Sequence, residues 1–322
     1  MSDQRTFAGL AWDSKKKVTR RERFLAEMDA VIPWAELIAL IHPHYPQAGN
    51  GRRPMPIRTM LRIYFLQQWF DLSDPAAEEA LYDSEAMRRF AHVELGDDAV
   101  PDETTILNFR HLLEAHQLTA QIFGLVHGLL AAKGLVLKSG TIVDATIISA
   151  PTSTKNAEKQ RDPEMHQTRK GREWYFGMKV HVGTDKRGFV HSLSTTAAHV
   201  ADVTVLPELL HGAERELYGD KAYWKEADRQ QCEAAGIKYR VNRRGTEQHP
   251  VSEYWKRINR ARSRVRARGE HAFHVVKTLW RFTKVRYRGL AKNTVRVYAL
   301  FALANLYLAR YKLGAREATC LC

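Results

Sequence analysis

Apolar positions in the first part of the chain recur at the three- and four-residue spacing of amphipathic helices. The segment 57–70 places Ile57, Leu61, Tyr64 and Phe65 near one face, which predicts a helix. Polar helix-start signals occur at residues 73–75 and 101–104. A further amphipathic run over residues 119–133 ends at Gly134, a residue typical of helix C-termini. This part of the chain is therefore predicted to be all-α.

The pattern changes near Gly140 to the alternating or β-branched runs that are typical of strands. The segment 152–172 is polar and has no period, so it is predicted to be a basic loop. The order of the elements predicts a mixed sheet flanked by helices. Strands are expected at residues 141–148, 174–183, 189–195, 217–220 and 237–241, and helices at 207–212, 224–235 and 260–279.

Composition restricts the class of protein. Hydrophobic residues make up 44% of the 322 positions and charged residues 27%, which excludes a disordered chain. The most apolar run, residues 297–309, carries an Asn and is shorter than the roughly 20 residues that a bilayer span needs, so it predicts a buried helix. Cysteine is scarce, and two of the three cysteines are Cys320 and Cys322. We therefore expect no disulfide framework and a reducing, cytosolic setting.

Basic residues are concentrated toward the C-terminal end. Residues 254–316 contain 17 Lys or Arg residues and one carboxylate, Glu270. The rest of the chain carries 33 basic and 35 acidic residues, so the formal net charge of +14 comes from this stretch. Such a surface favours a polyanion. A lone carboxylate would repel phosphate unless a metal ion lies between them, which makes Glu270 a candidate for chemistry. The alternative is a surface glutamate paired with Arg266 one turn earlier.

Two more carboxylates lie where solvated acids rarely do. Asp144 interrupts the apolar segment TIVDATII, where a buried acid must neutralise or find a cation. Asp220 follows a strand and a glycine, at the strand end where ligand sites of α/β sheets lie. Each has a simpler interpretation, because Asp144 could cap a turn or pair with an arginine and Asp220 could cap the next helix. Together with Glu270 on the last helix, they are predicted to converge at one edge of the sheet.

Several segments carry a resemblance to a known family. The sequence resembles a bacterial DDE transposase of the insertion-sequence family five type, whose catalytic domain is ribonuclease-H-like. Arg266, Glu270 and Lys277 meet the family's spacing of Arg, Glu and Lys, whereas Ser263 stands where the family has Tyr. The segments that match are TIVDATI, LYGDKAY and RVRARGEHAFHVVK in the second half, and RRPMPIRTMLRIYFLQQWFDLSD and VPDETTILNFRHLLE in the first.

The resemblance implies a fold class and a division of the chain. The fold expected is α/β, a ribonuclease-H-like mixed sheet flanked by helices and preceded by an all-α N-terminal domain. Residues 1–135 would form the helical domain, which binds DNA ends, dimerises or does both. Residues 136–290 would form the catalytic domain, and residues 291–322 a C-terminal helix packed on the catalytic domain, with a tail.

The three acids are expected to hold metal ions. Phosphodiester cleavage needs charge stabilisation on the attacking and the leaving oxygen, and two divalent ions supply it. Asp144, Asp220 and Glu270 are the expected catalytic and metal-binding residues, since Mg²⁺ prefers carboxylate oxygens. Asp144 would bridge two Mg²⁺ ions, with Mn²⁺ able to substitute. The resemblance implies hydrolysis that frees a 3′-OH, followed by its attack on target DNA. The residues alone would equally allow a metal-dependent nuclease without strand transfer.

Double-stranded DNA, as transposon ends and as target, is the expected partner. A homodimer is expected because two ends must be joined, and Tyr64, Phe65, Trp69 and Phe70 exceed what one apolar stripe needs, so some are expected to face a partner subunit. No membrane association is expected; the location expected is the bacterial cytoplasm, at the nucleoid when DNA is bound. The expected DNA contacts are Arg266, Lys277, Trp224, Lys221, Tyr223, Arg262, His274, Lys170, Arg172 and Lys179.

Overall fold

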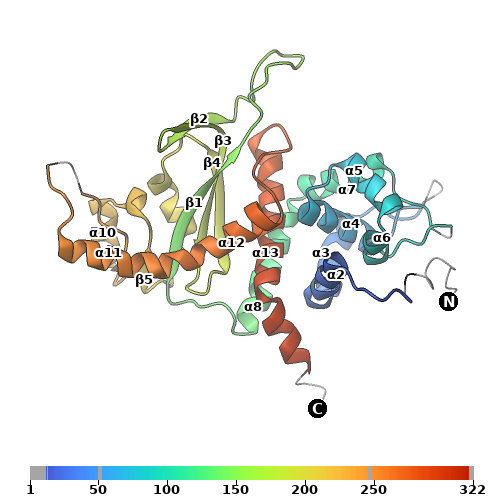
Figure 1. Ribbon diagram of the computed structural model, residues 1–322, viewed down its shortest axis with the longest axis horizontal. Helices are drawn as coiled ribbons and strands as arrows, with labels where there is room; N and C mark the ends of the chain where they lie inside the picture. Colours follow the sequence, from blue (N-terminus) through green and yellow to red (C-terminus); the bar gives the residue numbers. More distant parts are fainter. Residues whose placement is uncertain (1–11, 13, 50–52, 97, 246–247, 319–322) are drawn as a thin grey trace.

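A helical half and a sheet lie side by side, with the long C-terminal helix between them (Figure 1). The computed structural model describes residues 12, 14–49, 53–96, 98–245 and 248–318. Cys320 and Cys322, and the first residue of the matching segment RRPMPIRTMLRIYFLQQWFDLSD, lie outside these ranges.

The first half is all-α, as predicted. Its helices begin at capping residues: the Ser73 hydroxyl accepts from the Ala76 N–H, and the Asp102 carboxylate from the Thr105 N–H. Gly134 has a positive φ of 65° immediately after the last helix of this half, which explains why glycine ends it. The helices are α2 (Arg20–Val31), α3 (Trp34–Ile41), η1 (His42–His44), α4 (Ile57–Phe70), α5 (Asp74–Asp83), α6 (Glu85–Ala91), α7 (Glu103–Ala115) and α8 (Leu118–Ala132).

One six-stranded mixed sheet forms the second half within the described residues. The order is β2-β3-β1-β5-β6, and β4 also pairs with β3. Strand β1 is antiparallel to β3 and parallel to β5, which is in turn parallel to β6. This sheet, flanked by helices, confirms the predicted ribonuclease-H-like fold class. The strands are β1 (Thr141–Ser149), β2 (His166–Lys170), β3 (Glu173–Thr184), β4 (Val190–Ala197), β5 (Glu216–Tyr218) and β6 (Lys238–Tyr239).

The two faces of the sheet are covered by different cores. Met178 and Val180 of β3 pack into a large core that includes residues of α8 and of the C-terminal helix. Val143 and Leu217, on β1 and β5, pack into a smaller core with Cys232. The helices of this half are η2 (Asp202–Val205), α9 (Leu206–Leu209), η3 (Lys221–Tyr223), α10 (Glu226–Ala234), α11 (Glu253–Arg266), η4 (Ala267–Gly269), α12 (Glu270–His274), the π-helical turn η5 (Val275–Leu279) and α13 (Leu290–Ala318).

Two predictions about local structure were wrong. The expected loop 152–172 contains strand β2, whose five residues pair with the start of β3 although most of their side chains are exposed. The expected single helix 260–279 begins earlier, at Glu253, and runs through α11, η4, α12 and η5. Its tight turn brings Gly269 against β1, where an added Cβ would lie 3.0 Å from the Ile142 side chain. Close packing on the sheet therefore overrides a regular α-helical period.

The aromatic residues expected at a subunit interface are mostly internal. Tyr64, Phe65 and Trp69 are almost wholly buried in the large core, and Phe70 is partly buried against it. They do exceed what one narrow stripe needs, because α4 is surrounded by other helices and buries most of its circumference, so the excess packs within the chain. These side chains give no support to a dimer interface.

Helix α13 joins the two halves. It packs against α2 and α8 as well as against β4 and α12, and the predicted buried run 297–309 lies within it. Within the described residues no helix combines the length and apolarity needed to cross a bilayer. The expectation that this C-terminal helix packs on the catalytic half describes part of its contacts; it equally covers the helical half.

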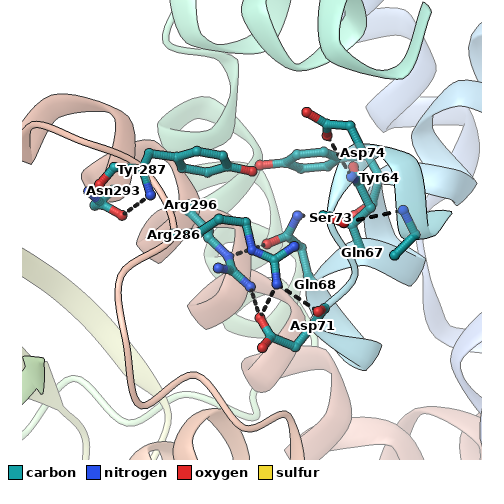
Figure 2. A network of polar contacts seen from close by, with 11 residues as sticks. Tyr64, Gln67, Gln68, Asp71, Ser73, Asp74, Arg286, Tyr287, Asn293 and Arg296 are labelled. Carbon is teal, nitrogen blue, oxygen red and sulfur yellow. Dashed lines mark hydrogen bonds and ion pairs between the residues drawn. The ribbon is translucent and has the colours of Figure 1, made fainter. Parts of the chain in front are cut away.

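A polar network also ties the halves together (Figure 2). Asp71, which ends α4 in a left-handed conformation, accepts hydrogen bonds from Arg286 at 2.9 Å and from Arg296 at 2.7 Å. The Arg296 Nε also donates to the Gln68 side chain at 3.2 Å. Since Arg296 is buried, its charge depends on these partners. The segment between η5 and α13, which contains Arg286, is thereby fixed to the N-terminal half.

Candidate active site

Asp144 and Asp220 lie at the same level of two neighbouring strands. Strands β1 and β5 are parallel, and Ile142 pairs with Tyr218, so each aspartate stands two residues beyond a paired position. Asp220 also caps η3, since its Oδ1 accepts from the Ala222 N–H at 2.8 Å. The simpler interpretation of Asp220 as a cap is therefore correct, and the charge of this carboxylate also raises the pKa of Asp144.

Arg266 contacts both Asp144 and Glu270. Its Nη1 donates to Asp144 Oδ2 at 3.0 Å, and its Nη2 lies 3.1 Å from Glu270 Oε1. The Asp144 side chain is largely buried, whereas the Glu270 side chain is 54% exposed at the start of α12. The ion pair one turn before Glu270, weighed as the alternative for this residue, is thus present, and the same guanidinium reaches the first strand.

The pKa of Asp144 reflects its burial first and the neighbouring charges after it. Burial raises the pKa of the Asp144 carboxyl from its ordinary 3.8 to about 6. Arg266 and the Ala145 N–H lower this pKa, while the charges of Asp220 and Glu270 raise it. The three acids are therefore close enough to repel one another, which is the arrangement that a bound cation relieves.

One open cavity of about 780 Å³ brings the three acids together with cations. Of the ten predicted DNA contacts, five line it: Arg266, Lys277, His274, Lys170 and Lys179. Lys277 donates to the Thr146 hydroxyl at 3.0 Å and to the Ile147 carbonyl at 3.1 Å, so it also holds β1. The remaining lining residues are Ala145, Thr146, Ile147, Thr168, Arg169, Asp202, Phe273 and Thr278.

The other five predicted contacts lie outside this cavity. Tyr223 is buried in the smaller core, and its hydroxyl has no hydrogen-bond partner among the described residues. Trp224 is half-buried and meets Tyr239 edge to face, with ring centroids 5.5 Å apart. Arg262 donates to the Val241 carbonyl at 2.6 Å, which makes it a structural residue. Lys221 lines a second cavity, and Arg172 is exposed in the turn between β2 and β3.

A fourth carboxylate, Asp202, was not identified from the sequence. It lines the same cavity and pairs with Lys179 at 2.9 Å between Nζ and Oδ1. The buried His181 lies 3.9 Å from the same oxygen, and burial lowers the pKa of His181 to about 4. The sequence feature that could have identified Asp202 is its position directly after strand β4 and the turn that follows this strand. The pairing neutralises Lys179, so this lysine is less available to phosphate than the sequence suggested.

The donor set suits hard divalent cations. Within the described part of the chain, no three His, Cys, Asp or Glu side chains are arranged around one point closely enough to hold an ion. Mg²⁺ needs less, because it is commonly held by one or two carboxylates together with waters and substrate phosphates. Asp144 with Asp220, and Asp144 with Glu270, provide two such carboxylate pairs at the cavity. The residues present therefore fit ions of this kind, which Asp144 with Asp220 and Asp144 with Glu270 would hold.

Comparison with known proteins gives two family matches that together span most of the chain. The transposase DDE domain matches residues 136–306, and a transposase domain (DUF772) matches residues 12–112. Among solved structures, the chain is similar to the crystal structure of the Mos1 strand transfer complex. That similarity has 15% identity and a TM-score of 0.30, and it covers 86% of this chain and 80% of that chain.

Proposed function

Because the chain belongs to the DDE transposase family, we propose that it is the transposase of a bacterial insertion sequence of family five. In this proposal it binds the terminal inverted repeats, cleaves a phosphodiester bond at each end and joins the freed 3′-OH to target DNA. The observation that supports it most is the convergence of Asp144, Asp220 and Glu270 on one cavity lined with cations.

The first half of the proposed reaction is hydrolysis. Divalent ions held by Asp144 with Asp220, and by Asp144 with Glu270, would supply Lewis-acid stabilisation to the attacking and leaving oxygens. Mg²⁺ is the proposed ion, with Mn²⁺ able to replace it. The cavity residues Lys170 and His274 would hold phosphates on either side of the scissile bond. A water oxygen bonds to phosphorus, the bond to the 3′ oxygen breaks, and the 3′-OH is released.

Strand transfer reuses the same groups. The 3′-OH attacks a target phosphate, a new P–O bond forms, and the displaced 3′ oxygen of the target leaves with a proton. When divalent ions bind to Asp144 and Glu270, the ion pairs of Arg266 with these two acids would break. The Arg266 guanidinium would then be available to a phosphate oxygen. We propose that a homodimer carries out both steps on paired ends. We place the enzyme in the cytoplasm, at the nucleoid when it is bound.

We propose that the three segments 1–135, 136–290 and 291–322 divide the work as the resemblance implies, with the helical segment contacting DNA ends or a second subunit. One family match ends at residue 112 and the other begins at residue 136, which supports a division near residue 135, whereas the second match runs on past residue 290 to residue 306.

A cleavage-and-joining assay tests the proposal. Purified protein is incubated in Mg²⁺ with labelled DNA from the ends that flank its coding sequence and with a supercoiled target. A transposase yields nicked ends and joined products of defined length. Cleavage without joined products would instead indicate a metal-dependent nuclease, and binding without cleavage a DNA-binding protein.

A further inference from the structure

A second cavity, of about 630 Å³, lies beside the active site and is lined mainly by cations. It begins at Lys221, the residue directly after Asp220. The loop after β6 and the first turns of α11 supply the other cations, and no carboxylate is among the lining residues that the structure describes. The lining residues are Lys221, Arg243, Arg244, Gly245, Val251, Lys256, Asn259 and Arg260.

Most of these cations make no ion pair within the described residues, although Arg260 lowers the pKa of Glu253 and Arg243 lowers that of Glu226 through their charges. Lys256 pairs with Glu253, with Nζ and Oε1 2.7 Å apart. In the part of the chain that the structure describes, the side chains of Lys221, Arg244 and Arg260 make no ion pair, and Arg243 contacts rings instead. Four charges of one sign around one cavity repel each other, and an anion that enters removes this repulsion.

The cavity is held in shape by the protein. The Asn259 side chain accepts from the Arg243 N–H at 3.0 Å and donates to the Arg243 carbonyl at 3.1 Å, so α11 fixes the loop in both directions. The Arg243 guanidinium lies 4.8 Å from the ring centroid of Trp255 and 5.9 Å from that of Trp224. An anion would therefore meet prepositioned donors, which reduces the entropy lost on binding.

The second cavity and the cations Arg169, Lys170 and Lys179 lie on opposite sides of β1. In the sheet, β2 and β3 carry Arg169, Lys170 and Lys179 on one side of β1, while the second cavity follows β5 and β6 on the other. Along the helices, Arg260 precedes Glu270 by ten residues and Lys277 follows it by seven. At about 1.5 Å per residue, Arg260 and Lys277 are roughly 25 Å apart, the length of about seven base pairs.

We propose that the second cavity binds phosphates of the DNA on the opposite side of the scissile bond from Arg169 and Lys170. This inference rests on the proposed function, because it assumes a DNA strand across the acids. The carboxylates then lie between two cation groups, one for each DNA segment that cleavage separates. After cleavage, each of the two DNA segments would stay bound to the protein, one at the second cavity and the other at the first.

The test uses two double variants that remove equal charge. Arg244→Ala with Arg260→Ala changes the cavity, and Lys238→Ala with Arg257→Ala removes two exposed cations that line neither cavity. Binding is measured by fluorescence anisotropy without divalent ions, so that no cleavage occurs. Three duplexes are compared: one extends far on both sides of the cut site, and the others are shortened to two base pairs on one side.

The cavity variant should bind the full duplex roughly tenfold more weakly than the wild type, and the control should bind less than threefold more weakly. The weaker binding of the cavity variant should persist on the duplex that keeps the DNA on the side of the second cavity. It should disappear on the duplex that is shortened on that side. Arg169→Ala with Lys170→Ala should show the reverse pattern. Unaltered thermal unfolding would show that the variants remain folded.

Three results would overturn the inference: a cavity variant that binds like the control, a defect independent of which side is shortened, or tighter binding of a matched RNA duplex that the cavity variant abolishes. Because the readout is binding, it is independent of joining. A protein that shows the two-sided pattern but never joins ends would refute the transposase proposal while leaving the cavity assignment intact.

Discussion

The guanidinium of Arg266 donates to the carboxylate of Asp144 at 3.0 Å, although 122 residues separate them in the sequence. The contact places a protein cation among acids that are expected to hold divalent ions. In the proposed reaction Arg266 would have two alternative partners, the carboxylates before ions enter and a phosphate afterwards. The predictions below use this competition and the other contacts described above.

Removing Arg266 should tighten metal binding while weakening DNA binding. In Arg266→Ala the acids lose a competing cation worth about 1 kcal/mol, so Mn²⁺ should bind roughly fivefold more tightly in the absence of DNA. Isothermal titration calorimetry measures this affinity. Arg264→Ala, an exposed cation two residues earlier, is the control and should leave Mn²⁺ affinity unchanged. Weaker Mn²⁺ binding in Arg266→Ala would mean that the guanidinium orients the acids rather than competing for them.

Each acid should be indispensable for cleavage but not for DNA binding. Asp144→Asn, Asp220→Asn and Glu270→Gln each remove a ligand charge and little volume, and Asn still caps η3 at position 220. Cleavage in Mg²⁺ should fall at least a thousandfold, a loss of roughly 4 kcal/mol in transition-state stabilisation. Asp228→Asn, a partly exposed aspartate of α10 that lines neither cavity, is the matched control. Near-normal cleavage by any one of the three variants would remove that residue from the site.

Stability without divalent ions should depend on the protonation of Asp144. Its pKa is raised to about 6, so between about pH 4 and pH 6 the folded protein binds a proton that the unfolded chain releases. Stability from this group is therefore fully present below pH 4 and is lost as the pH rises through 6. The difference is about 3 kcal/mol at most. Urea unfolding at pH 4 and pH 7 gives the free energy of unfolding of both proteins. Relative to the wild type, Asp144→Asn should be more stable at pH 7 than at pH 4. Equal differences at both values would contradict this account.

The network around Asp71 should contribute measurably to stability. Asp71→Ala leaves Arg296 buried without its carboxylate partner and should lower the free energy of unfolding by about 2 kcal/mol, since Asp71 itself is partly exposed. Asp83→Ala, an exposed aspartate at the end of α5, should change it by less than about 0.5 kcal/mol. Denaturant melts of both variants measure the difference. Similar values for the two would show that water replaces the lost partner.

The homodimer stays a prediction that needs a direct measurement. Two ends must be cut and joined, and each chain has one set of acids, so the complex with end DNA should contain at least two copies. Light scattering of that complex gives its mass. A strictly monomeric complex that joins both ends would refute the prediction. Deleting the first 135 residues would not locate the interface, because it would remove much of a core that the two halves share.

Patterns that depend on local chemistry were readable from the sequence. Capping residues at Ser73 and Asp102 marked helix starts, and the β-branched run around Asp144 marked the first strand. An acid inside such a run has few explanations, which is why the acids could be selected. That they line one cavity was predicted from the order of the elements and is what the geometry now shows.

Features that depend on tertiary contacts were not readable. Strand β2 has mostly exposed side chains and no alternation, so its pairing with β3 leaves no pattern in the sequence. The burial of Trp69 depends on helices far from it in the chain. The pairing of Asp202 with Lys179 depends on how the turn after β4 packs against the neighbouring strand β3. Charge could be counted along the chain, but its separation into the cavity that holds the acids and a second cavity without acids required the fold.

Helix α13 has a consequence for how the protein is made. Its buried residues, among them Leu300 and Phe301, belong to the same core as Met28 of α2 and Val180 of β3. Because synthesis proceeds from the N-terminus at roughly 5–20 residues per second, this helix leaves the ribosome after every element it packs against. Neither half can bury its apolar surface fully until then. A message cut short before α13 would therefore yield an aggregation-prone chain rather than a smaller enzyme.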